Sequence, residues 1–189
     1  SPFFMNLTAC MVVIIITNSL TRYSGDMAVG AYGIINRFLF FFVMIVIGLM
    51  QGMQPIVGYN YGAKLYNRVF QVLKLSLLFA TLISITGFLL GEILPHLITS
   101  MFTTDKELAD ISIKGMKIMM LAVPLLGAQV ISTGFFQSIG YVKTAIFLSL
   151  LRQLILIIPA LLVLPLFFGL NGIWMSVPIS DFLATVISL

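Results

Sequence analysis

The stretch MQGMQPIVGYNYGAK, residues 50–64, decides the fold of this chain. It ends a long apolar run, residues 38–50, and leads into a basic segment. Gln51 and Gln54 stand three positions apart, so on a helix they share one face. Pro55 lacks a backbone donor and predicts a kink, which a membrane helix tolerates when its neighbours satisfy the freed backbone groups.

Glycines recur at four-residue spacing on both sides of the proline. Gly48 and Gly52 form one small-x-x-x-small pair, and Gly58 and Gly62 form another. Such pairs let neighbouring helices approach closely in lipid. The whole stretch therefore predicts a membrane helix that is bent, closely packed and polar on its inner face.

The composition is that of an integral membrane protein. Of the 189 residues, 60% are hydrophobic and 8% are charged, against about 25% charged residues in an average soluble domain. The length matches about six helical spans of roughly 20–25 residues. The net charge of +4 comes from cations scattered between apolar segments, as membrane topology requires, so no nucleic-acid partner is predicted. Cys10, the only cysteine, lies in an apolar run and predicts no disulfide.

The hydrophobic pattern predicts an all-α membrane fold, with one six-helix lobe over residues 1–189. The expected helices are 3–20, 29–59, 69–94, 105–139, 144–168 and 173–189. The second helix is longer than a bilayer is thick, so it must tilt, kink or protrude. The chain opens without an initiator Met and stops inside an apolar run, which predicts an internal piece of a longer protein.

Local sequence signals predict where the fourth helix begins and where it is interrupted. Thr104 and Glu107 have the spacing of a capping box, which predicts that Thr104 is the N-cap. Pro124 and Gly127 predict an interruption further along the helix. The preceding residues, 96–103, are expected to form a short interfacial connector.

Charged residues between the helices predict the orientation. With six antiparallel spans, one side of the membrane carries only cations, whereas the other carries cations together with acids. The cationic side comprises Lys64, Arg68, Lys74 and Lys143. We therefore expect the loops at 64–74 and 141–143 to be cytoplasmic and the protein to lie in the cell's inner (plasma) membrane.

Three ionisable residues lie far from any predicted loop: Arg37, Arg152 and Asp181. A charge at the bilayer centre costs roughly 2.5–3.5 kcal/mol on insertion scales, so each needs a partner or water. Arg152 and Asp181 lie about 25 Å and about 18 Å from the turn between the last two helices, so we expect them to pair. Three roles are open for this pair: it fixes helix packing, it takes part in coupling to a cation or proton, or it lines a substrate cavity. Arg37 either snorkels to the outer interface or joins such a pathway.

Uncharged polar residues also interrupt the long helices. They surround a water-filled cavity, or they tie helices together through hydrogen bonds of about 0.6 kcal/mol each. They are Asn36, Gln51, Gln54, Gln129 and Gln137. Together with the three intramembrane charges, they are the candidate residues of a substrate or cation pathway.

The sequence carries no catalytic motif. It has no phosphate-binding loop, hydrolase motif, CxxC or paired-carboxylate spacing. His96, the only histidine, has no second histidine or nearby cysteine and is not expected to bind a metal. We therefore expect neither an enzyme nor a nucleotide-driven pump, and no cofactor beyond a coupling ion.

Several stretches resemble the multidrug and toxic compound extrusion (MATE) family. They are QGMQPIVGYNYGAK (51–64), NRFLFFFVMIVIG (36–48), FFQSIGYVKTA (135–145), LLRQLILIIPALLVLPLFFGLNGIW (150–174), PISD (178–181) and SPFFMNL (1–7). The resemblance covers essentially the whole chain, keeps its spacing and points to the carboxy-terminal half of the family.

The resemblance implies a twelve-helix transporter of two six-helix lobes, with a central cavity that opens alternately to each side. Such a transporter exports cationic and amphipathic drugs in exchange for inward Na⁺ or H⁺. The implied partners of this chain are the missing amino-terminal lobe, small organic cations and membrane lipid. Some members place a coupling carboxylate in the tenth helix, but the matching segment here, residues 118–139, holds no acid. Asp181 is then a structural or auxiliary group, and one lobe alone is not expected to transport.

Two other functions remain open at this stage. A lipid-linked oligosaccharide flippase is similar in its helical layout and needs a cationic cavity for pyrophosphate. Only Arg37 and Arg152 are candidates for such a cavity, and Arg152 has an acid within reach. A membrane scaffold, in which the polar residues only pack helices, is the third possibility, and cation-dependent efflux would exclude it.

Overall fold

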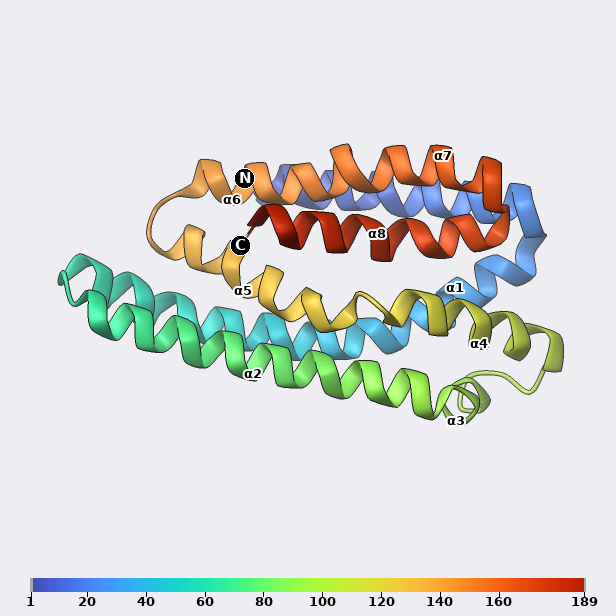
Figure 1. Ribbon diagram of the computed structural model, residues 1–189, viewed down its shortest axis with the longest axis horizontal. Coiled ribbons are helices and arrows are strands. Elements are labelled where there is room, and N and C mark those ends of the chain that lie inside the picture. The colour runs from blue at the N-terminus through green and yellow to red at the C-terminus, as the bar shows by residue number, and fades with distance from the viewer. Residues whose placement is uncertain (1, 189) are drawn as a thin grey trace.

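The computed structural model describes residues 2–188, apart from the side chains of residues 2–6, Tyr23, Leu148 and Ser188. In this range all regular elements are helical. In chain order they are α1 (Pro2–Gly62), α2 (Tyr66–Ile93), α3 (Pro95–Ser100), α4 (Lys106–Met120), α5 (Val123–Ser138), α6 (Val142–Leu150), the π-helix η1 (Leu151–Ile157), α7 (Ile158–Phe168) and α8 (Leu170–Ser188). The long helices run along the longest axis of an elongated bundle, and the chain reverses at its two ends (Figure 1).

Most of these helices are long and apolar enough to cross a bilayer. By length and composition, four qualify: Ser24–Gly62, Tyr66–Ile93, Val142–Phe168 and Leu170–Ile187. The bent pair α4 and α5 counts as a fifth span, and Leu7–Arg22 is a shorter apolar helix. The predicted all-α membrane fold is confirmed, and the predicted number of six spans holds as an approximate count.

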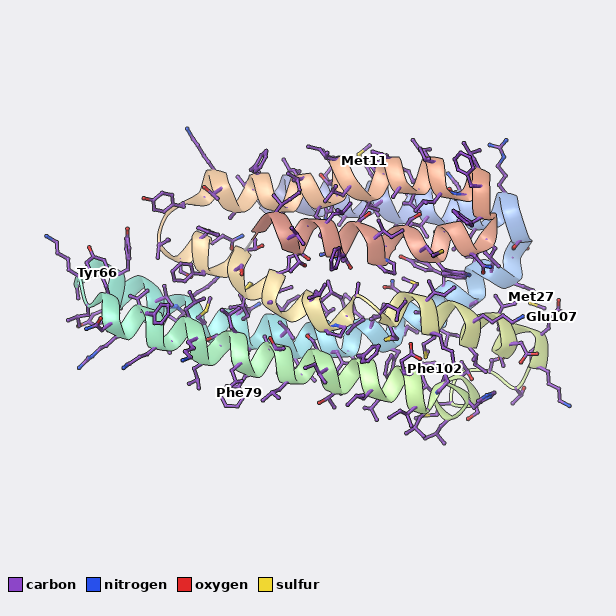
Figure 2. The ribbon with its side chains drawn as sticks, viewed as in Figure 1. Met11, Met27, Tyr66, Phe79, Phe102 and Glu107 are labelled. Carbon is purple, nitrogen blue, oxygen red and sulfur yellow. The ribbon has the colours of Figure 1, made fainter. Side chains whose placement is uncertain are left out.

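Large apolar side chains cover the outside of the bundle, as lipid contact requires. Met11, Phe79 and Phe102 are exposed, and Figure 2 shows them at the periphery of the helices. The buried side chains form two clusters instead. One contains Trp174 among residues of α1, α4, α7 and α8, and the other joins α1 to α2 and α5.

The sharp break inside α1 lies at Gly25 and not at the predicted Pro55. Gly25 has φ 69° and ψ −164°, a conformation that is open essentially only to glycine. Pro55 lies inside the helix, and the only non-helical backbone described within α1 is at Gly25. The helix then continues to Gly62, slightly beyond the predicted end at residue 59.

The predicted close packing through the two glycine pairs holds at one of the four positions only, because a Cβ on Gly58 would lie 3.4 Å from the backbone oxygen of Ser138 on α5. Among the described atoms, none lies within 4 Å of a Cβ built on Gly48, Gly52 or Gly62. The tight contact lies instead between α2 and α5. A Cβ on Gly127 would meet the backbone oxygen of Ala80 and would lie 2.5 Å from Oγ of Ser84. Small residues permit close approach only on the face that meets a neighbouring helix.

The start of α4 also differs from the prediction. The N-cap is Asp105 and not Thr104, because Oδ1 of Asp105 accepts hydrogen bonds from the backbone N–H groups of Glu107 (2.9 Å) and Leu108 (3.3 Å). Residues 96–103, the expected connector, lie largely within α3.

The predicted interruption of the fourth helix is present, but its position differs. The chain bends by 53° between α4 and α5, and the break lies at residues 121–122, ahead of Pro124. Pro124 occupies the first turn of α5, where a proline ring is tolerated because no intrahelical N–H bond is lost. Gly127, the second predicted breaker, lies inside α5.

Candidate functional site

An ion pair joins η1 to α8 in the middle of the bundle. Nε of Arg152 donates to Oδ1 of Asp181 over 2.6 Å. The side chain of Asp181 is 2% exposed and that of Arg152 is 26% exposed. The predicted pairing of these two residues is therefore confirmed. Their register depends on the tight α7–α8 hairpin, in which a Cβ on Gly172 would meet the backbone oxygen of Leu164.

Arg152 lies in the π-helix η1, and the sequence that follows explains why the helix widens there. Pro159 follows η1 in the first turn of α7. Because proline has no N–H and its ring collides with the carbonyl four residues earlier, the α-helical pattern cannot run through Ile155 undisturbed. A π-turn, with hydrogen bonds to the fifth residue, is one way to accommodate this defect, and such turns are frequent at functional sites.

One side of Arg152 faces a cavity of about 230 Å³, called cavity A here. Its polar wall consists of Gln129, Thr133 and Gln137 from α5 and of Ser149, Arg152 and Gln153 from the α6–η1 segment, and Ile47, Met50 and Val130 complete it. The three α5 residues recur every four positions, so they form one stripe along the helix. Cavity A is therefore polar along two facing helices and apolar elsewhere.

Two amide oxygens near cavity A have no partner within the described part of the chain. Oε1 of Gln129 and Oε1 of Gln153 are buried without a hydrogen bond, and Gln129 as a whole is 7% exposed. A third glutamine in the wall is satisfied, because Nε2 of Gln54 donates to Oε1 of Gln137 over 3.3 Å. Buried polar atoms are normally bonded to protein or to ordered water, so the two unpaired oxygens indicate a hydrated site.

The other side of Arg152 faces a second cavity, of about 270 Å³, called cavity B. Its polar residues are Tyr32, Asn36, Arg152, Gln153 and Asp181, and its remaining wall is apolar, with residues such as Phe40 and Met119. Val130, Arg152 and Gln153 line both cavities. The ion pair thus lies where the two cavities meet.

The structure brings together most, though not all, of the candidate pathway residues. Gln129, Gln137 and Arg152 line cavity A, Asn36, Arg152 and Asp181 line cavity B, and Gln54 bonds to Gln137. Arg37 and Gln51 are exposed and contribute to neither wall. A role of any of these residues in a pathway stays a prediction.

Sequence reasoning missed four polar residues of the two walls. They are Tyr32, Thr133, Ser149 and Gln153. The four-residue spacing of Gln129, Thr133 and Gln137 was the available signal for one of them. In the part of the chain that the structure describes, no group of three His, Cys, Asp or Glu residues is placed to hold a metal ion.

A helical bundle with several membrane-capable helices and a buried ion pair between two cavities is the architecture of a polytopic membrane protein, in which intramembrane charges commonly mark a substrate or ion pathway. The comparison with protein families narrows the class. Residues 2–162 match the family described as MatE, so the chain belongs to the MatE family. The membership expected from the sequence motifs is confirmed.

Individual relatives agree with this assignment. The chain is 27% identical over 187 residues to the multidrug export protein MepA of Staphylococcus aureus (strain MSSA476), covering 99% of this chain and 41% of that protein. The MATE multidrug transporter DinF-BH, whose structure is that of a ligand complex, is 40% identical, with a TM-score of 0.86 over 99% of this chain and 42% of that one. An outward-facing MATE transporter of the MOP superfamily shares the fold, with a TM-score of 0.90 at 14% identity, over 98% of this chain and 42% of that one. The chain therefore spans about two fifths of the length of these proteins.

Proposed function

We propose that this chain is the carboxy-terminal lobe of a secondary active multidrug exporter. The complete protein exchanges cationic or amphipathic organic compounds for inward Na⁺ or H⁺ by alternating access. The observation that carries the proposal is the family match over residues 2–162, together with 40% identity to the multidrug transporter DinF-BH. The partner of this lobe is an amino-terminal lobe of six helices, which closes the central cavity.

The energy source follows from the chemistry that the chain offers. The sequence has no phosphate-binding loop, so an ion gradient is the remaining driving force for this lobe. When one inward cation is exchanged for an uncharged compound, one net charge crosses the membrane, and a potential of 100 mV supplies about 2.3 kcal/mol, equivalent to a roughly 40-fold concentration ratio. When it is exchanged for a monovalent organic cation, no net charge moves, and the concentration gradient of the coupling ion is the driving force. The ion and the drug shift the conformational equilibrium only through their differential affinities for the two states.

The walls of cavity B fit an amphipathic compound. Apolar side chains such as Phe40 and Met119 dominate, and a few polar groups, including Tyr32 and Asn36, converge on them. Ligand sites typically combine an apolar wall with a few polar groups that fix orientation. Methionine also repacks easily around ligands of different shape.

The charges at the two ends of the bundle support an orientation in the plasma (inner) membrane. The turns after α1 and after α5 lie at the same end (Figure 1). Lys64, Arg68 and Lys143 are exposed there, whereas Asp105 and Asp110 lie near α3 and α4, at the other end. The other end also carries cations, at Arg22, Lys106, Lys114 and Lys117, but together with these acids. We assign the basic end, which carries cations without acids, to the cytoplasm, where loops are enriched in Lys and Arg.

Dye efflux from cells that carry the full-length parent protein tests this function. We expect export of a cationic dye that stops when a protonophore or the removal of Na⁺ collapses the coupling gradient. The matched variants are Asp181→Asn in the ion pair and Asp110→Asn, an exposed carboxylate outside both cavities. If Asp181→Asn loses gradient-dependent efflux and Asp110→Asn does not, Asp181 belongs to the coupling machinery. If Asp181→Asn retains gradient-dependent efflux, Asp181 serves only to pack the helices.

The flippase alternative predicts a different result in the same cells. It needs a cationic cavity, but the guanidinium that reaches cavities A and B is already paired with Asp181. Translocation of a lipid-linked oligosaccharide without export of any dye would overturn the proposed function.

A further inference from the structure

The polar stripe on α5 leads from one end of the bundle to the buried ion pair. Gln129, Thr133 and Gln137 line cavity A along about 12 Å of helix, since eight residues rise 1.5 Å each. Gln137 lies one residue before the end of α5 at Ser138. The turn that follows, with Gly140 at φ 85°, belongs to the basic end of the lobe. Cavity A therefore lies between that end and the ion pair.

The unpaired polar groups around cavity A require water as a hydrogen-bond partner. Oε1 of Gln129 and Oε1 of Gln153 each need a donor, and Nε is the only guanidinium nitrogen of Arg152 with a hydrogen bond among the described residues. A water molecule that donates to the oxygens and accepts from the guanidinium satisfies both kinds of group. A volume of about 230 Å³ has room for several such molecules.

We propose that cavity A is a water-filled inlet that carries protons from the basic end of the lobe to the Arg152–Asp181 pair. Val130, Arg152 and Gln153 form the partition between this inlet and cavity B, because all three residues line both cavities. The hydration of the inlet follows from the cavity and its unpaired polar groups and does not depend on the proposed function. Its use by protons rests on the proposed function and deepens it, because it assigns the coupling ion of this lobe.

The surroundings of Asp181 favour a proton over Na⁺. A hard cation needs several oxygen ligands, but Oδ1 of Asp181 is held by Arg152, whose positive charge repels a metal ion. The titratable groups on the walls around Asp181 are Arg152 from η1 and Tyr32 from α1. No second carboxylate lines either cavity within the described residues.

A proton delivered by the inlet changes the partition directly. It forms an O–H bond on the carboxylate of Asp181, and the neutral carboxyl group no longer holds Nε of Arg152 by charge. The guanidinium is then free to move within the two cavities, which opens the partition. Loss of the proton restores the ion pair and closes it.

Cysteine accessibility in the full-length parent, made cysteine-free, tests the inlet. Ser149→Cys and Thr133→Cys place thiols in cavity A. Phe147→Cys is the control on α6, two positions from Ser149 but exposed and outside the cavity, and Ile131→Cys is the fully buried control on α5. The probe is a charged, membrane-impermeant methanethiosulfonate, applied to right-side-out and inside-out vesicles.

We expect the two cavity thiols to react at least tenfold faster than both controls, and only from the side of the α5–α6 turn. Equal rates at cavity and control positions, or entry from the opposite side, would overturn the inlet. Val177→Cys lines cavity B alone and should become reactive from that side only when Asp181→Asn opens the partition. Unchanged reactivity would overturn the partition.

The same variants are assayed for gradient-driven dye export, so that the two proposals fail separately. Export with unreactive cavity thiols leaves the function standing and removes the inlet. Reactive thiols without any export leave the hydrated inlet standing and remove the proposed function. Export that follows the Na⁺ gradient and ignores the pH gradient overturns the assignment of the proton.

Discussion

Replacing Arg152 or Asp181 singly should destabilise the lobe, and the two replacements should do so by unequal amounts. The contact is short, 2.6 Å, but burial is asymmetric, because Asp181 is 2% exposed and Arg152 is 26% exposed. Arg152→Met leaves a buried carboxylate without its partner, which costs about 3–5 kcal/mol. Asp181→Asn leaves a guanidinium that is 26% exposed and lines cavity A, where water can hydrate it, so we expect a cost of about 1–3 kcal/mol.

A double-mutant cycle measures whether the two residues act as a unit. In Arg152→Met/Asp181→Asn no charge remains unpaired, so the loss should fall short of the sum of the single losses by about 2–3 kcal/mol. The assay is thermal unfolding of the purified full-length parent in one detergent. Arg37→Met serves as the control, because Arg37 is exposed and outside both cavities, and should change stability by less than about 0.5 kcal/mol.

Additive losses would refute this reasoning, because they mean that the two side chains do not stabilise each other. A larger loss in Asp181→Asn than in Arg152→Met would refute it as well. That order would show that the guanidinium, and not the carboxylate, depends on its partner for burial.

Three backbone and packing predictions are tested by the same unfolding assay. Gly127→Ala places a methyl group against the backbone of α2 and should cost about 1–3 kcal/mol, whereas Gly48→Ala meets no described atom within 4 Å and should be neutral or stabilising. Asp105→Ala removes the N-cap of α4 and should cost about 1 kcal/mol, with little effect from Thr104→Ala. Gly25→Ala forces a Cβ into the break of α1 and should cost about 1–3 kcal/mol. A reversed order within either matched pair, or a stabilised Gly25→Ala, would contradict these assignments.

The sequence predicted the features that depend on helix register. A tight turn between two antiparallel helices fixes which residues lie at the same depth, so the pairing of Arg152 with Asp181 followed from counting residues. Composition and run length likewise predicted a helical membrane fold. Both signals can be read from the order of residues along one chain and need no knowledge of which helices are neighbours.

The features that the sequence did not predict depend on which face of a helix meets another helix. Gly48 and Gly52 have the same spacing as a packing motif, but they lie on an exposed face, whereas Gly127 lies against α2. The partition depends on Gln153, which a π-turn places beside both cavities. A proline predicts a disturbed helix, but not whether the helix kinks, as expected at Pro55, or widens, as before Pro159.

Coupled flux in proteoliposomes that contain the full-length parent tests the central claim most directly. A pH-sensitive dye trapped inside reports proton movement, while a fluorescent organic cation is added outside under an imposed pH or Na⁺ gradient. We predict that the pH gradient drives accumulation of the cation, that the cation in turn moves protons the opposite way, and that a protonophore abolishes both. Movement of the cation that ignores both gradients, or no movement at all, would contradict the assignment of this lobe to an ion-coupled exporter.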